Sequence, residues 1–122
     1  MAFILTKPAV SLTGIPGTIL TNINLPISTT VVVDSVLLAF NTSVKWLVTL
    51  LDPTGFTVIT SYEILALHKN GTNPSFTKYA IIGDKIIHNV DVAIFGTDLQ
   101  LKITNNEAIN LQANIVRIQT IT

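Results

Sequence analysis

Residues 44–64 read VKWLVTLLDPTGFTVITSYEI and carry the clearest structural signal in the chain. Apolar and polar side chains alternate from Val44 to Leu50, which is the pattern of a half-buried β-strand. Asp52-Pro53-Thr54-Gly55 then combines a proline that fixes φ with a glycine that eases the exit from a turn. The chain returns through β-branched residues from Phe56 to Ile64. This stretch predicts an antiparallel hairpin in which Trp46 faces the core.

The same chemistry extends over the rest of the chain. Ile, Val and Thr dominate, and the segment from Leu99 to Thr104 alternates without a break. No stretch shows the apolar period of a helix, and turn-forming residues recur at intervals of roughly ten positions, as in all-β folds. Further strands are expected at 18–24, 29–40, 76–82, 85–95 and 109–121. The sequence therefore predicts an all-β, antiparallel β-sandwich, jelly-roll-like, of seven to nine strands, with a small barrel as the alternative.

The chain has the length of one domain. Its 122 residues are enough to bury roughly two-thirds of the surface that the unfolded chain exposes. Residues 1–17 contain two prolines and two glycines and predict an extended N-terminal arm. Residues 18–122 are predicted to form the sandwich, because no internal repeat or linker interrupts them.

Charged residues are sparse. Only 11% of residues are Asp, Glu, Lys or Arg, against roughly 25% in an average globular domain. Seven basic and seven acidic residues cancel, so no long-range field directs the protein to nucleic acid or to an anionic membrane. The apolar fraction is 48% and the mean hydropathy is +0.58. Such a surface predicts that part of it is buried against other chains, in a homo-oligomer.

The sequence shows no sign of export or membrane insertion. Its apolar runs are much shorter than the roughly 20 residues of a spanning helix. The first residues, Met1 to Leu5, lack a basic segment and meet Lys7-Pro8 too early for a signal peptide. The absence of cysteine excludes disulfides and thiolate metal sites and favours folding in a reducing cytosol. We expect a protein that is made and kept soluble.

Residues suited to catalysis form no recognisable motif. No serine lies in a Gly-x-Ser-x-Gly elbow, and Gly14-Ile15-Pro16-Gly17 lacks the Lys-Ser/Thr and the helix of a phosphate loop. His68 is expected to be solvated at a loop edge, and His88 to point out of its sheet. The aspartates, including Asp34, are expected at strand ends, bends or turns. We predict no enzyme, no catalytic residue, no cofactor and no dedicated metal site, and leave open a surface Ca²⁺ held by turn aspartates.

Aromatic residues offer one route to a binding function. Tyr62 and Tyr79 are the candidates for exposure, whereas Trp46 alternates with aliphatic residues and is assigned to the core. A glycan-binding function would be favoured if both tyrosines and the loop from His68 to Ser75 converged on one exposed groove.

From Lys45-Trp46 to Arg117-Ile118 the chain resembles the small β-sandwich structural proteins of tailed-phage particles. The resemblance rests on the order of Lys45-Trp46, Asp52-Pro53-Thr54-Gly55, Tyr62-Glu63-Ile64-Leu65-Ala66, Asn70-Gly71, Tyr79-Ala80-Ile81-Ile82-Gly83-Asp84 and the alternation from Leu99 to Asn105. It implies a virion component synthesised in the host cytoplasm, either a capsid decoration (cement) protein or a small tail or baseplate subunit. Proteins of this kind are short, cysteine-free and frequently trimeric.

The leading hypothesis is a homotrimeric capsid decoration protein that clamps neighbouring subunits of the major capsid protein. The alternative is a tail, baseplate or adhesin-type module that recognises a host glycan or a partner protein. Both functions depend on contact surfaces, and neither involves nucleic acid or membrane. The predicted partner contacts lie in the arm and in the loop after residue 68, at Phe3, Ile4, Leu5, Pro8, Ile15, Pro16, Asn70, Asn73, Pro74 and Phe76.

Overall fold

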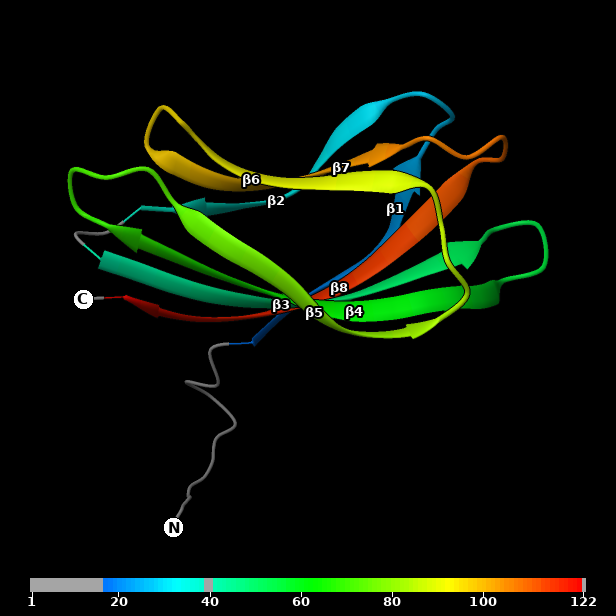
Figure 1. Cartoon of the computed structure of the whole chain (residues 1–122), viewed down its shortest axis with the longest axis horizontal. Coiled ribbons are helices and arrows are strands. Elements are labelled where there is room, and N and C mark those ends of the chain that lie inside the picture. The colour runs from blue at the N-terminus through cyan, green and yellow to red at the C-terminus, as the bar shows by residue number, and fades with distance from the viewer. Residues whose placement is uncertain (1–16, 39–40, 122) are drawn as a thin grey trace, which may run out of the picture.

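The computed structural model describes residues 17–38 and 41–121, and within these ranges every regular element is a β-strand (Figure 1). The strands are β1 (Gly17–Leu25), β2 (Thr30–Leu37), β3 (Asn41–Asp52), β4 (Thr57–Lys69), β5 (Ser75–Gly83), β6 (His88–Phe95), β7 (Asp98–Asn105) and β8 (Leu111–Ile121). The predicted arm lies almost entirely outside the described residues, so its boundary at residue 17 stays a prediction.

The strands form two facing sheets. A large sheet has the order β1-β8-β3-β4-β5, a small sheet has the order β2-β7-β6, and all pairs are antiparallel. Figure 1 shows the small sheet stacked over the large one. The pairs β1–β8 and β2–β7 are nested as in a jelly roll, whereas β3, β4 and β5 follow one another as a meander. The predicted sandwich is confirmed, and the barrel alternative is not.

The predicted central hairpin forms β3 and β4. Its register runs from Asn41 opposite Lys69 to Asp52 opposite Thr57. The Thr54 amide donates a hydrogen bond to Asp52 Oδ1 at 2.9 Å, so the aspartate closes the turn. The second strand is longer than expected, because β4 continues past Ile64 to Lys69.

Alternate side chains of both sheets fill the space between them. Trp46 and Tyr62 are the largest fully buried residues, and β7 buries every second residue from Leu99 to Asn105. The aliphatic core around them consists of Leu25, Val33, Val36, Val44, Val48, Leu50, Ile64, Ala66, Ile86, Val92, Leu99, Leu101, Ile103, Leu111, Ala113 and Ile115. Period-two alternation in the sequence thus places one apolar face of each sheet against the other.

A charged cluster crosses this core. The Asp34 carboxylate of β2 accepts hydrogen bonds from Trp46 Nε1 at 2.8 Å and from Arg117 Nη1 at 2.8 and 2.9 Å. Arg117 Nη2 also donates to Thr18 Oγ1 at 3.0 Å. The carboxylate therefore joins the small sheet to β3 and β8 of the large sheet, and Arg117 extends the cluster to β1.

A bulge directs Asp34 inward. The register between β2 and β7 shifts between Val32 and Asp34, so Val33 and Asp34 are both buried although they are consecutive. The expectation that Asp34 lies at a bend is wrong. The residue is inside a strand, and its side chain is only 5% exposed.

A second polar anchor closes one end of the sandwich. Asn105 is completely buried, and its Nδ2 donates to the carbonyl oxygens of Leu25 and Ile109, both at 2.8 Å. Its Oδ1 accepts from the Glu107 amide at 2.8 Å. One side chain thus satisfies three backbone groups where the chain turns from β7 towards β8.

Asp34→Asn should destabilise the domain by about 3 kcal/mol, because it leaves the Arg117 guanidinium half-buried without a counter-charge. The free energy of unfolding is measured by urea titration with Trp46 fluorescence. Asp91→Asn, at an exposed position of β6, is the matched control and should change stability by less than about 0.5 kcal/mol. Equal losses in the two variants would show that the buried pair contributes nothing specific.

Candidate functional site

The outer face of the large sheet carries an apolar surface. Leu47 of β3 lies between Val116 of β8 and Glu63 of β4, and Ile19 of β1 lies beyond Val116. Lys45 in the next row lies between Ile118 and Leu65. The exposed fractions are Ile19 71%, Leu47 42%, Leu65 43%, Leu67 44% and Ile118 49%. We call these five residues and Val116 the apolar face.

A polar trio interrupts this surface. Lys45 Nζ lies 3.0 Å from Glu63 Oε1, and the Tyr79 hydroxyl donates to the same oxygen at 2.9 Å. The hydrogen bond from Lys45 is the main cause that lowers the pKa of Glu63, and the bond to Glu63 raises the pKa values of Lys45 and Tyr79. The two charges therefore neutralise each other within the face.

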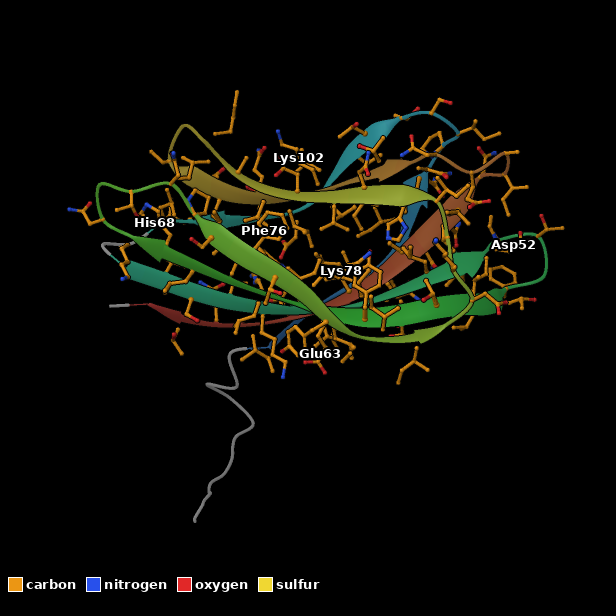
Figure 2. All side chains as sticks on the ribbon, viewed as in Figure 1. Asp52, Glu63, His68, Phe76, Lys78 and Lys102 are labelled. Carbon is orange, nitrogen blue, oxygen red and sulfur yellow. The ribbon has the colours of Figure 1, made fainter. Side chains whose placement is uncertain are left out.

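The outer face of the small sheet is different in character. Lys102 of β7 lies between Val32 and Asp91, and the hydroxyls of Thr30 and Thr104 are 2.6 Å apart. Figure 2 shows Lys102 and Glu63 on opposite outer sides of the molecule. Val32, Leu37 and Phe95 are also exposed on this side, but they lie beside Lys102 and Asp98, so the small sheet has a mixed polar and apolar outer surface.

A cleft opens where the two sheets differ in width. β5 and β6 are edge strands, and residues 84–87 cross directly from one to the other. A cavity of about 400 Å³ lies beside this crossing. Its walls include Lys78, Ile81, Asp84, Lys85, Ile86 and His88, and its floor includes Thr60, Tyr62 and Gly83. We call it the edge cleft; Figure 2 shows Lys78 between β5 and the small sheet.

Backbone geometry shapes the edge cleft at two points. β5 carries an extra residue opposite Tyr62, and Ala80 there has a φ of 54°, which marks a bulge. Gly83 has a φ of 104°, and a Cβ on it would lie 2.4 Å from the Ile59 carbonyl oxygen. Only glycine fits this close approach, and the Asp84 amide then donates to Ile59 O at 2.9 Å.

Tyr62 and His88 form a fixed pair at the cleft floor. The Tyr62 hydroxyl lies 2.9 Å from His88 Nε2, and His88 Nδ1 lies 3.0 Å from the Ile86 carbonyl oxygen. A carbonyl can only accept, so Nδ1 carries the proton, Nε2 accepts and Tyr62 donates. The rings are stacked with centroids 5.5 Å apart, and Lys78 Nζ lies 4.8 Å from the Tyr62 ring centroid. Burial is the main cause that lowers the pKa of His88, and burial raises the pKa of Tyr62.

Both histidine predictions are wrong. His68 is buried on the inner side of β4 because the alternation Tyr62, Ile64, Ala66 continues to it. His88 is half-buried and faces Tyr62, so it points between the sheets and not out of them. Extending the period-two pattern through Ala66 would have predicted the burial of His68.

The two tyrosines do not converge. Tyr62 is buried between the sheets, whereas Tyr79 binds Glu63 on the outer face of the large sheet. The loop after Lys69 joins the end of β4 to the start of β5, whereas the edge cleft adjoins the opposite ends of both strands. The single groove on which the glycan hypothesis depended is therefore not formed by these residues.

The predicted partner contacts stay predictions. Phe3, Ile4, Leu5, Pro8, Ile15 and Pro16 lie outside the described residues. Asn70, Asn73 and Pro74 lie in the loop between β4 and β5, where Thr72 N and Oγ1 both donate to Lys69 O. Phe76 lies opposite Ala66 and is 39% exposed. The apolar face was not among the predicted contacts, although Leu47, Leu65 and Leu67 occupy the outward positions of the predicted hairpin and its extension.

Residues 17–38 and 41–121 contain no group of three or more His, Cys, Asp or Glu side chains placed to hold a metal ion. The same ranges contain no helix of the length and apolarity needed to cross a membrane.

The comparisons with known proteins identify structural neighbours but no family. No protein-family model and no curated protein sequence matches the chain. The crystal structure of the Acinetobacter phage vB_ApiP_P1 tailspike protein aligns with a TM-score of 0.53 and 12% identity, over 97% of this chain and 24% of that one. The Acinetobacter baumannii phage AM24 tailspike protein aligns with a TM-score of 0.47 and 7% identity, over 92% and 27%.

This chain therefore spans about a quarter of the length of either tailspike. At 12% identity, the likeness to the vB_ApiP_P1 protein is a likeness of fold. It agrees with the two-sheet architecture described above.

The stability of the domain should decrease as pH falls below about 6.5, the ordinary histidine pKa. Because the folded pKa of His88 is lowered, the unfolded chain binds a proton in this range that the folded chain does not. The contribution of neutral His88 to the free energy of unfolding is fully present above the histidine pKa of the unfolded chain. It is lost as the pH falls from that value through the pKa of His88 in the folded chain. The free energy of unfolding between pH 7.5 and 5.5 should have a smaller slope in His88→Gln, whose amide oxygen can still accept from Tyr62. Identical slopes would contradict the assignment.

Proposed function

We propose that the chain is a non-catalytic, self-associating structural module of a tailed-phage virion, located in the tail, and that the apolar face is its main contact surface. The observation that carries the proposal is the gathering of Ile19, Leu47, Leu65, Leu67 and Ile118 on one outer sheet face. Contiguous exposed apolar surface of this kind marks interaction sites. Burying this surface stabilises a complex by roughly 25 cal/mol for each Å² of apolar area removed from water.

Charge favours a second copy of the chain as the occupant. The face holds one Lys45–Glu63 pair, so it presents no net charge that would select an acidic or a basic partner. Copies arranged around a three-fold axis can place Lys45 of one near Glu63 of the next. The zero net charge of the whole chain also leaves little long-range repulsion between copies.

The fold supports the tail over the capsid surface. The neighbour with a TM-score of 0.53 is a phage tailspike protein, and the likeness covers 97% of this chain. The capsid decoration hypothesis has no comparable support. Because this chain covers only 24% of that tailspike, we propose a shared building block and not the activity of the whole protein. A trimer and contacts through the arm and the Asn70–Pro74 loop remain part of the proposal.

Leu47→Lys should weaken self-association by about tenfold or more, because a charge that is desolvated in the interface costs more than 1.4 kcal/mol. In the monomer the new lysine lies opposite Glu63, so folding should be preserved. Size-exclusion chromatography with light scattering over a range of concentrations measures the mass, and circular dichroism checks the fold.

Val32→Glu is the matched control. Val32 is 46% exposed on the outer face of the small sheet and lies opposite Lys102, so this variant also adds a charge beside an opposite one. It should keep the wild-type mass. A wild-type protein that is monomeric at all concentrations would overturn the proposal, as would equal effects of the two variants.

A further inference from the structure

We propose that the edge cleft binds a small organic anion in which hydroxyl groups surround a carboxylate. The proposal concerns the inner side of the large sheet and does not depend on the proposed self-association. It rests on the size of the cleft, on two cationic side chains that form no ion pair within residues 17–38 and 41–121, and on the rigid floor beneath them.

The cleft has the size of a small-molecule site. Its volume of about 400 Å³ lies in the range of roughly 300–1,000 Å³ that ligand pockets occupy. Ile81 and Ile86 contribute apolar wall, and polar groups come from Thr60, Tyr62, Lys78, Asp84, Lys85 and His88. Such a lining suits a small polar ligand that also presents some apolar surface.

Two ammonium groups define the charge that the cleft prefers. The ion pairs among the described residues join Lys45 to Glu63 and Arg117 to Asp34. Lys78 and Lys85 therefore have no ion-pair partner within those residues, and both line the cleft. The Tyr62 ring holds the Lys78 ammonium by a cation–π contact at 4.8 Å, which orients the ammonium and leaves its charge uncompensated.

A single carboxylate accompanies the two cations. Asp84 lines the same cleft and can accept hydrogen bonds from hydroxyl groups but cannot itself bind an anion. Two cations and one acceptor match a ligand with one negative group and several hydroxyls. The ligand carboxylate would lie near Lys78 and Lys85, and its hydroxyls near Asp84.

The floor is fixed before any ligand arrives. The Tyr62 hydroxyl donates to His88 Nε2, and His88 Nδ1 donates to the Ile86 carbonyl oxygen, so these groups position the walls and do not compete for the ligand. Gly83 holds β5 against Ile59 at the same place. A pocket with locked supporting contacts loses little entropy on binding.

The test is a titration of the ¹⁵N-labelled full chain with glucuronate, followed by amide chemical shifts. Two control ligands separate the recognised groups. Glucose has the hydroxyls but no carboxylate, and acetate has the carboxylate but no hydroxyls. Glucuronate should shift the amides from Gly83 to His88 with a Kd of about 1 mM. Glucose and acetate should each bind at least about tenfold more weakly, since each lacks half of the recognised chemistry.

Variants locate the site. Lys78→Met should weaken glucuronate binding about tenfold or more. Lys85→Met should have the same effect and provides the test if Lys78→Met folds poorly. Lys102→Met, on the outer face of the small sheet, is the control and should bind like wild type. Leu47→Lys should also bind like wild type, so failure of the apolar-face proposal would not affect this result. No shift with glucuronate, equal binding of glucose or acetate, or equal effects of Lys78→Met and Lys102→Met would each overturn the proposal.

Discussion

The Asp34 carboxylate fixes how the two sheets face each other. Hydrophobic contacts bring the sheets together but tolerate sliding, because aliphatic side chains have no directional partner. The bonds from Asp34 to Trp46 and Arg117 are directional and charge-assisted. A shift of either sheet would leave a carboxylate and a guanidinium in the core without partners, which costs several kcal/mol. The apolar face and the edge cleft therefore have fixed positions relative to each other.

The sequence predicts local pairing well and long-range pairing poorly. The hairpin of β3 and β4 follows from alternation and from Asp52-Pro53-Thr54-Gly55, because both strands and their turn are contiguous. The inward position of Asp34 depends on a bulge opposite β7, whose residues lie more than sixty positions away. No local sequence pattern marks such a bulge. The bulge is defined by how β2 pairs with β7, and the residues around Val33 and Asp34 do not encode that pairing. His88 was misassigned for the same reason: its partner Tyr62 lies on another sheet.

The unequal width of the sheets produces a concave feature, the edge cleft, that joins both of them. Five strands face three and β5 is an edge strand, so Lys78, which lies opposite Ile64 on the inner side of β5, is at the rim of the sandwich beside the edge cleft. The crossing from β5 to β6 then closes one end of the opening. Neither the sheet order nor this crossing is encoded in a short motif, so sequence patterns could identify Tyr62 and His88 but could not bring them together.

The two surfaces suit different kinds of contact because their polar groups differ in their freedom. On the apolar face, Lys45, Glu63 and Tyr79 already bond to one another, so a partner chain need not supply a counter-ion. Binding of such a chain would be favoured by the removal of leucine side chains from water. In the edge cleft, Lys78 is held by an aromatic ring, which orients the ammonium without neutralising it. A satisfied ion pair favours a large, weakly polar partner, whereas an oriented and uncompensated cation favours a small charged one. The proposed assembly surface and the proposed ligand site thus lie on opposite sides of one sheet.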